Sequence, residues 1–177
     1  METERLILRL PEAGDVPAMA AALADFAVAK NLATAPHPYG EDDARVFVAR
    51  AAEGLARGEA YCFAILRKED RLLVGCCGLH RKEASWELGY WLAKPWWKLG
   101  YATEAAGRLL AFAFEELKLE RLEAGWFHDN AASGRVLAKL GFEADHVEPY
   151  ECRARGARVL CNRCMLTREG FGRKKAA

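Results

Sequence analysis

One stretch of the chain combines a single glycine with the start of a helix, a combination that favours anion binding. Residues 97–105 read Trp-Lys-Leu-Gly-Tyr-Ala-Thr-Glu-Ala, with the glycine at Gly100. Apolar residues then recur at helical spacing, at Ala102, Ala106, Leu109, Leu110, Ala113 and Leu117. The first turn of a helix leaves N–H groups without partners and carries partial positive charge, while glycine lets a ligand approach the backbone closely. The segment therefore predicts a phosphate site, with a purely structural helix start as the alternative.

The rest of the chain predicts the elements that position this loop. Strands are expected at 5–10, 61–66, 72–79, 86–92, 121–127, 142–147 and 159–166. A helix capped by Asp15 is expected to run to Leu23, another spans 41–57, and a third spans 130–140 before Gly141. Hairpins dominate the first half of the chain, so the order predicts a mixed sheet covered by helices.

Two helices carry a pattern that assigns their faces. The helix at 41–57 is expected to turn four apolar residues inward, namely Val46, Phe47, Ala51 and Leu55. The helix that follows Gly100 is expected to turn charged residues toward solvent, namely Glu104, Arg108 and Glu115. Five aromatic residues before and within the loop are expected to form core and cleft walls: Trp86, Tyr90, Trp91, Trp96 and Trp97.

Length and composition set the broad class. A chain of 177 residues suits one domain with a full core, expected at 1–170 and followed by a short basic tail at 171–177. The net charge of +1 gives no reason to expect nucleic acid as a partner. No run approaches the roughly 20 apolar residues of a membrane span, and residues 1–5 do not resemble a signal peptide. A cytoplasmic protein with no membrane partner is expected.

The six cysteines fit the same expectation. Cys161 and Cys164 form one CxxC pair, whereas a zinc site needs about four convergent ligands. Side chains three apart on a strand point to opposite faces, so no metal site is expected, with Cys152 as the residue that keeps the alternative open.

The loop and its surroundings resemble the GNAT acyl-CoA-dependent N-acetyltransferases. Their pyrophosphate loop reads [QR]-x-x-G-x-[GA], which Gly100 and Ala102 match while Trp97 replaces the first polar residue. The RimJ/RimL-like branch, which includes ribosomal-protein-alanine N-acetyltransferases, reads W-G-K-G-Y-A-T-E-A there, and this chain has Lys98 in place of the first of those two glycines. Together with the strand at 86–92 and the run Asn130-Ala-Ala-Ser133, the resemblance covers roughly residues 3 to 169.

The resemblance implies a fold and a coenzyme. The fold is α/β (α+β), with a mixed central sheet, splayed strands four and five, helices on both faces, and acyl-CoA in the gap. Backbone groups near Leu92 and Ala93 would pair with the pantetheine arm and help to fix the thioester carbonyl. The coenzyme-binding residues expected in the loop and the first turn of the helix after it are Trp97, Lys98, Leu99, Gly100, Tyr101, Ala102 and Thr103. Asn130, at the start of the helix expected at 130–140, is a further one. Asn130 could instead cap its helix.

Two side chains are the expected catalytic residues. Ser133 matches a serine proposed in the family to donate a proton or hydrogen bond to the departing sulfur, although serine is also common in the first turn of a helix. Glu87 occupies a position where several relatives carry glutamate, and partial burial would raise its pKa into the range of a useful base. An ordinary ion-paired strand carboxylate is the alternative for Glu87. His80 and His128 are alternative bases.

The function implied is acetyl transfer from acetyl-CoA to a primary amine, directly in a ternary complex and without a metal. The acceptor could be a protein N-terminus or a small amine such as an antibiotic or polyamine. The other class of function is a non-catalytic acyl-CoA-binding sensor. Whether the chain forms a homodimer is left open.

Overall fold

The computed structural model describes residues 1–83 and 85–176, the side chains of the last two excepted, and it is built on a seven-stranded sheet. The strand order is β1-β2-β3-β4-β5-β7-β6, and every neighbouring pair is antiparallel except β4 and β5. The strands span Leu6–Arg9 (β1), Ala60–Arg67 (β2), Leu73–Arg81 (β3), Trp86–Leu92 (β4), Arg121–Phe127 (β5), Glu143–Cys152 (β6) and Ala157–Thr167 (β7). The expected mixed sheet is confirmed, including the bounds of β4 and β5.

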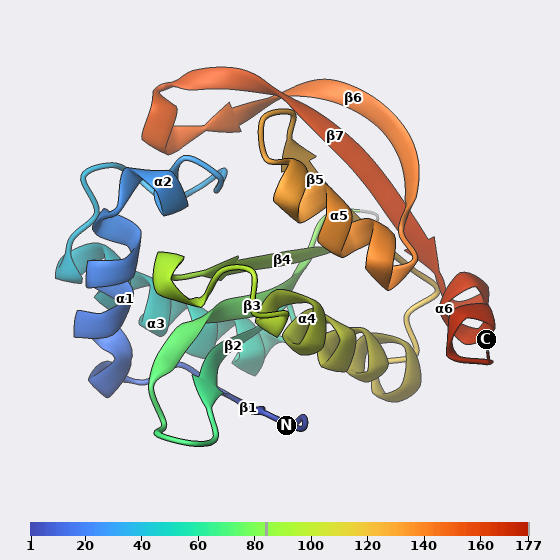
Figure 1. Cartoon of the computed structure of the whole chain (residues 1–177), viewed down its shortest axis with the longest axis horizontal. Helices are drawn as coiled ribbons and strands as arrows, with labels where there is room; N and C mark the ends of the chain where they lie inside the picture. The colour runs from blue at the N-terminus through green and yellow to red at the C-terminus, as the bar shows by residue number, and fades with distance from the viewer. Residues whose placement is uncertain (84, 177) are drawn as a thin grey trace.

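Helices cover both faces of this sheet (Figure 1). They span Val16–Ala24 (α1), Phe26–Ala29 (α2), Glu41–Arg57 (α3), Tyr101–Ala111 (α4), Ala131–Leu140 (α5) and Arg168–Ala176 (α6). Short turns of other helix types lie at Ala13–Asp15 (η1), Lys94–Trp96 (η2), Phe112–Glu116 (η3) and Arg153–Arg155 (η4). The predicted helix to Leu117 therefore continues past Ala111, but its last five residues, Phe112–Glu116, have π-helix geometry.

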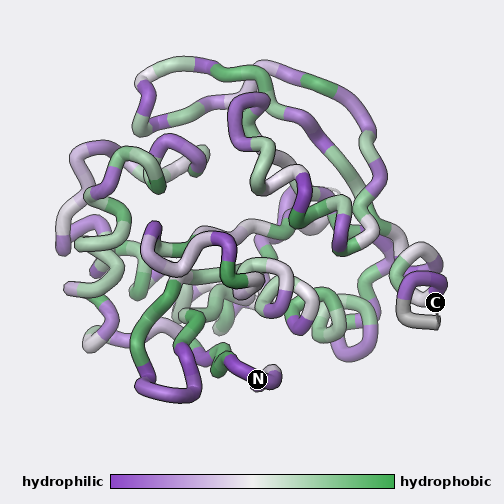
Figure 2. The backbone as a smooth tube through the Cα atoms, viewed as in Figure 1, coloured by the Kyte–Doolittle hydropathy of each residue, from purple (hydrophilic) through white to green (hydrophobic). Residues whose placement is uncertain are grey.

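Strand alternation sends successive side chains into two separate cores. Cys77 and Leu79 of β3 pack with Leu109 of α4 on one face of the sheet. Cys76, the residue before Cys77, packs with Met19 of α1 on the other face. Figure 2 shows these hydrophobic strands leading into a hydrophilic β2–β3 turn. Among residues 1–83 and 85–176, no helix is both long and apolar enough to cross a membrane.

The inward face of α3 differs from the prediction. Val46 and Leu55 are 49% and 40% exposed, whereas Ala44, Ala51 and Gly54 are buried. A Cβ on Gly54 would lie 2.7 Å from the Cβ of Ala60 on β2. The helix lies so close to the sheet that small residues form the contact, among them Ala51, as predicted. Phe47 also packs against this core, partly buried, whereas Val46 and Leu55 remain at the sides of the helix.

Two acidic side chains also differ from the prediction. Asp15 lies at the N-terminus of α1 but does not cap it, because its carboxylate accepts hydrogen bonds from the Arg9 guanidinium and the Glu12 N–H. Glu104 does not face open solvent, since it accepts hydrogen bonds from the Thr3 hydroxyl at 2.6 Å and from Arg5 Nε at 2.7 Å. Both carboxylates therefore fasten the N-terminal segment to the fold.

The C-terminal residues continue as helix α6, and the expected basic tail begins within it. The ring of Phe171 stacks on Phe114, with centroids 5.1 Å apart, so this helix packs against the main core. Residue 177, the last of the expected tail, lies outside the described residues.

Candidate active site

Strands β4 and β5 separate from each other inside the sheet. In the part of the chain that the structure describes, Glu87 and Glu123 are the one pair of Cα partners that join them. Beyond that pair the two strands run on to Leu92 and Phe127 without further pairing. This arrangement gives a gap between two parallel strands, bordered by backbone that the sheet does not use.

Backbone hydrogen bonding determines which groups of β4 face the gap. The Ala93 N–H donates to the Val74 carbonyl at 2.9 Å, so Ala93 faces β3. Residues of an antiparallel strand alternate in the side to which they direct their N–H and C=O groups, so Leu92 and Tyr90 face the gap instead. The expectation for Leu92 is compatible with this register, whereas the Ala93 N–H is already used within the sheet. Tyr90 takes its place as the second backbone that faces the gap.

A pair of hydroxyl groups lies beside the gap, on the face covered by α4 and α5. The hydroxyl oxygens of Tyr90 and Ser133 are 2.8 Å apart, and the Tyr90 hydroxyl also lies 3.2 Å from the Ser133 carbonyl oxygen. Burial raises the pKa of Tyr90 to about 12, against the opposing effect of its hydrogen bond with Ser133. Tyr90 was expected only to line the core or a cleft. The alternation of Trp86, Leu88, Tyr90 and Leu92 on one face was the signal that could have placed its hydroxyl at the gap.

The first turn of α5 fixes Ser133 in this position. Asn130 caps the helix, because its side-chain oxygen accepts a hydrogen bond from the Ser133 N–H at 3.3 Å. Gly134, the next residue, packs directly on β5, and a Cβ there would lie 2.8 Å from the Trp126 ring. Of the two roles expected for Asn130, capping is therefore the one that the structure shows.

The loop before α4 contains two residues with left-handed backbone conformation, one on each side of Leu99. Lys98 has φ 64° and Gly100 has φ 85°, a backbone conformation that glycine adopts at little cost. No side chain caps α4, so the first N–H groups of the helix point outward from its N-terminus. Tyr101 is buried beneath the Arg5 guanidinium, so its contribution to a ligand site would come from its backbone.

Trp97 fastens this loop to the end of β4. Its indole N–H donates to the Leu92 carbonyl at 2.8 Å, and its ring packs against the buried clusters on both faces of the sheet. The side chains of Lys98 and Leu99, the next two residues of the loop, are exposed to solvent. The structure thus shows Trp97 packing the loop at the point where β4 leaves the sheet.

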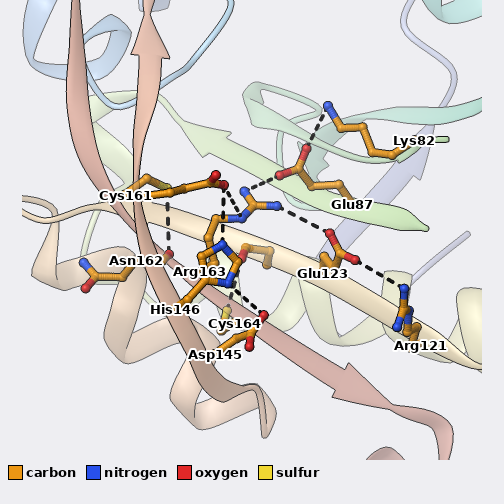
Figure 3. A network of polar contacts seen from close by, with 12 residues as sticks. Lys82, Glu87, Arg121, Glu123, Asp145, His146, Cys161, Asn162, Arg163 and Cys164 are labelled. Atoms are coloured by element: carbon orange, nitrogen blue, oxygen red, sulfur yellow. Dashed lines mark hydrogen bonds and ion pairs between the residues drawn. The ribbon is translucent and has the colours of Figure 1, made fainter. Parts of the chain in front are cut away.

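Glu87 lies on the other face of β4 from Tyr90. It is half-buried, and its carboxylate lies 2.6 Å from Arg163 Nη1 and 3.1 Å from Lys82 Nζ (Figure 3). Burial acts to raise the pKa of Glu87, but the hydrogen bond and charge of Arg163, together with Lys82, outweigh it and hold the pKa below its ordinary value. The expected rise in pKa is therefore wrong, because the sequence did not show that two cations converge on this carboxylate.

Comparison with known proteins identifies the family to which this chain belongs. The family model described as an acetyltransferase (GNAT) domain matches residues 5–143. The chain belongs to the GNAT acetyltransferases. The uncharacterized N-acetyltransferase p20 of Bacillus licheniformis is 30% identical over 146 residues, which cover 81% of this chain and 82% of p20.

Solved GNAT structures have the same fold. An acetyltransferase of the GNAT family from Bacillus anthracis superimposes with a TM-score of 0.83 at 25% identity, covering 96% of this chain and 98% of the other. RimJ of Mycobacterium smegmatis, solved with CoA-disulfide, gives a TM-score of 0.82 at 23% identity over 97% of this chain and 88% of RimJ. The expected GNAT fold is therefore confirmed.

In this GNAT chain, the tip of the β6–β7 hairpin lies beside the segment that follows α2 (Figure 1). Arg155 Nε donates to the Lys30 carbonyl at 2.9 Å, and the Arg155 guanidinium also lies 3.0 Å from Asp129. The Arg153 N–H donates to the Ala33 carbonyl at 2.9 Å. These contacts hold residues 30–33 beside the hairpin. Leu32 packs in the same cluster as Trp91, which lies on the face of β4 that carries Glu87.

The two cysteines of the CxxC pair lie on opposite faces of the GNAT sheet, with Cys161 in a third, smaller cluster. Cys161 packs with Phe127 and Cys152 on one face, whereas Cys164 packs with Leu122 on the other. Within the described residues, no group of three or more His, Cys, Asp and Glu side chains has the arrangement of a metal site.

Proposed function

We propose that this GNAT enzyme transfers an acetyl group from acetyl-CoA directly to a primary amine. The observation that carries the proposal is the gap between β4 and β5, with an uncapped helix start at one end and the Tyr90–Ser133 pair beside it. Solved relatives described as bound to CoA, among them RimJ of Mycobacterium smegmatis, support the choice of coenzyme.

The residues present fit a long, phosphorylated thioester. The N–H groups at the start of α4 would bind its diphosphate, because that end of a helix attracts anions. The backbone of Leu92 and Tyr90 would hydrogen-bond the amide-containing arm within the gap. Acetyl-CoA supplies an acetyl group that is already activated, so the protein has chiefly to hold, orient and stabilise.

The Tyr90–Ser133 pair would stabilise the departing sulfur. A thiol has an ordinary pKa of about 8.5, far below the pKa of about 12 of Tyr90, so the hydroxyl pair would not lose its proton completely. It would instead donate a hydrogen bond to the developing negative charge at sulfur. Ser133 therefore acts together with Tyr90.

Glu87 would act on the acceptor side. Its lowered pKa keeps the carboxylate ionised near neutral pH but makes it a weak base, so its role is to orient the amine. An α-amine has a pKa of about 8, so water can remove its proton. Direct transfer is supported by the cysteines of the sheet, since burial raises the pKa of Cys62 to about 11 and that of Cys164 to about 12.

A single amine, such as a protein N-terminus, is the acceptor that the charges favour. A solved spermidine N-acetyltransferase from Vibrio cholerae shares the fold at 17% identity and is described as bound to spermine. A polyamine carries several positive charges and is held best by several free carboxylates. In this chain Arg163 contacts Glu87, Glu123 and Glu148 at once, and its positive charge offsets part of their negative charge. These pairings support an acceptor with one positive charge.

The deciding experiment measures thiol release from acetyl-CoA with a panel of N-terminal peptides, antibiotics with amino groups, and polyamines. Turnover with peptides above that with polyamines is expected. Binding of CoA by calorimetry without turnover on any amine would instead identify an acyl-CoA sensor and reject the proposal.

A further inference from the structure

Arg163 lies at the point where the two strands of the gap part. It comes from β7 and is 9% exposed. Its guanidinium lies 2.6 Å from Glu87 of β4 and 3.7 Å from Glu123 of β5, the two residues that form the β4–β5 pair. Figure 3 shows the guanidinium between these two carboxylates. One side chain therefore joins both edges of the gap at its closed end.

Two further side chains contact this guanidinium, and one glycine leaves room for it. Glu148 of β6 lies 3.5 Å from Arg163 Nε, and the Tyr150 ring lies under the guanidinium at 5.4 Å. Gly125 of β5 is the residue directly paired with Arg163, and a Cβ there would lie 2.9 Å from Arg163 Nη1. The absence of a side chain at Gly125 thus leaves the room that the guanidinium occupies.

We propose that Arg163 is a positioning residue that fixes β4 against β5 where they separate, and so sets the geometry of the acetyl-transfer gap. The inference rests on the proposed function, because the gap is the proposed site of transfer. The physical argument is the shape of the side chain. A guanidinium is a planar group with five donors and can bind carboxylates of several strands at once, whereas a lysine ammonium is a compact point charge that cannot match this geometry.

The contact with Arg163 also lowers the pKa of Glu87. The hydrogen bond and charge of Arg163 are the main influences that hold the pKa of Glu87 down against the effect of burial. The charged and titratable groups on the elements around Glu87 are Arg163 and Cys161 from β7, Lys82 after β3, His80 opposite it on β3, Glu123 from β5, and Glu148 and Tyr150 from β6. Replacing Arg163 with lysine removes the guanidinium hydrogen bond, which is the largest influence that lowers the pKa of Glu87, so this pKa would rise.

The test compares Arg163→Lys with Glu148→Gln. Arg163→Lys keeps a positive charge but removes the link between β4 and β5, whereas Glu148→Gln removes a contact of the same guanidinium that involves neither strand. A misplacement of about 1 Å at a reacting group costs on the order of 100-fold in rate. We expect kcat to fall by about that factor in Arg163→Lys, with the acidic limb of the pH–rate profile moved to higher pH. Glu148→Gln should stay close to the wild type in both measurements.

A second variant protects the test against a folding defect. Gly125→Ala changes no charge, and its Cβ would lie 2.9 Å from both Arg163 Nη1 and Cys161 Sγ, so the guanidinium must shift together with its β7 neighbour. It should lower kcat in the same direction as Arg163→Lys. If both variants lose only melting temperature, while kcat and the pH profile match the wild type, Arg163 has a purely structural role and the proposal is overturned. Equal losses in Arg163→Lys and Glu148→Gln would also overturn it.

Calorimetry with CoA separates this inference from the proposed function. If the wild type binds CoA but acetylates no amine, the proposed function fails, and the affinity for CoA then tests the positioning role alone. A weaker affinity in Arg163→Lys than in Glu148→Gln would support the role of Arg163 in shaping the gap. Identical affinities would reject it.

Discussion

Replacing Tyr90 with phenylalanine removes a single hydroxyl beside the gap and leaves the ring in the core. That hydroxyl lies 2.8 Å from Ser133 Oγ, and a hydrogen bond of this kind contributes a net of about 1 kcal/mol. If the contribution is realised at the departing sulfur, its loss lowers the rate about 5-fold. Ser133→Ala removes the hydroxyl that we place with it at the sulfur, and losing one preorganised hydrogen-bond donor to a developing negative charge costs at least about 100-fold in rate.

The double variant decides whether the two hydroxyls act as a unit. Independent contributions would multiply to a loss of about 500-fold, whereas a coupled pair would lose only about 100-fold, as in Ser133→Ala alone. We expect the coupled result, because the Tyr90 hydroxyl contacts the reaction through Ser133. The assay is thiol release at saturating amine and acetyl-CoA, with melting temperatures measured in parallel.

A matched control is Tyr61→Phe, which removes a hydroxyl from β2, where the ring packs against Trp86 and Phe112. It should leave kcat unchanged. Losing one hydrogen bond in Tyr90→Phe should lower the melting temperature by about 2–4 °C in a chain of this size. A multiplicative loss in the double variant, or a drop in melting temperature with kcat preserved in Ser133→Ala, would refute the assignment of this pair to the sulfur.

Three further variants test the remaining parts of the site. Gly100→Val should weaken CoA binding by at least about 10-fold in calorimetry, because a β-branched residue is strained at φ 85° and the start of α4 would shift; unchanged affinity in folded protein would argue against the loop as the diphosphate site. Glu87→Gln should lower kcat more than it weakens CoA binding. Because the pKa of Glu87 is lowered, its carboxylate stays ionised through neutral pH and is protonated only as the pH falls below the ordinary range for glutamate. An acidic limb of the wild-type pH–rate profile near pH 7 therefore cannot be assigned to Glu87. Arg155→Gln should raise KM for the amine and leave the affinity for CoA unchanged, because Arg155 holds residues 30–33 on the Glu87 side of the gap, and a change confined to CoA would contradict that placement.

The fold could be predicted largely because its signals are local. The alternation of apolar residues along β4 and along the start of β5 is contained in the segments themselves, and both strands have the predicted bounds. The C-terminus of α5 followed in the same way from Gly141, which has φ 93°. The face of α3 was wrong at Val46 and Leu55, because hydrophobicity alone does not show how closely a helix approaches the sheet.

The site was less predictable because its chemistry depends on distant partners. Arg163 lies 76 residues from Glu87 in the sequence, so the ion pair that lowers the pKa of Glu87 leaves no local signal. The same holds for Ser133 and Tyr90, which are 43 residues apart and come together only when α5 packs on the sheet. The loop at 97–103 has a local signal, since its glycine and helix pattern are adjacent in the sequence.

The period of a strand also explains how one short segment can serve both substrates. Tyr90 and Glu87 are three residues apart on β4, so their side chains lie on opposite faces of the sheet. The hydroxyl pair therefore lies on the face of α4 and α5, while the carboxylate lies on the face bordered by the β6–β7 hairpin. An acetyl group held in the gap between them would meet its leaving-group donor from one side and its amine from the other. Arg163 joins the two strands of the gap on the carboxylate face, so any change in its position would alter the distance between these two halves of the reaction.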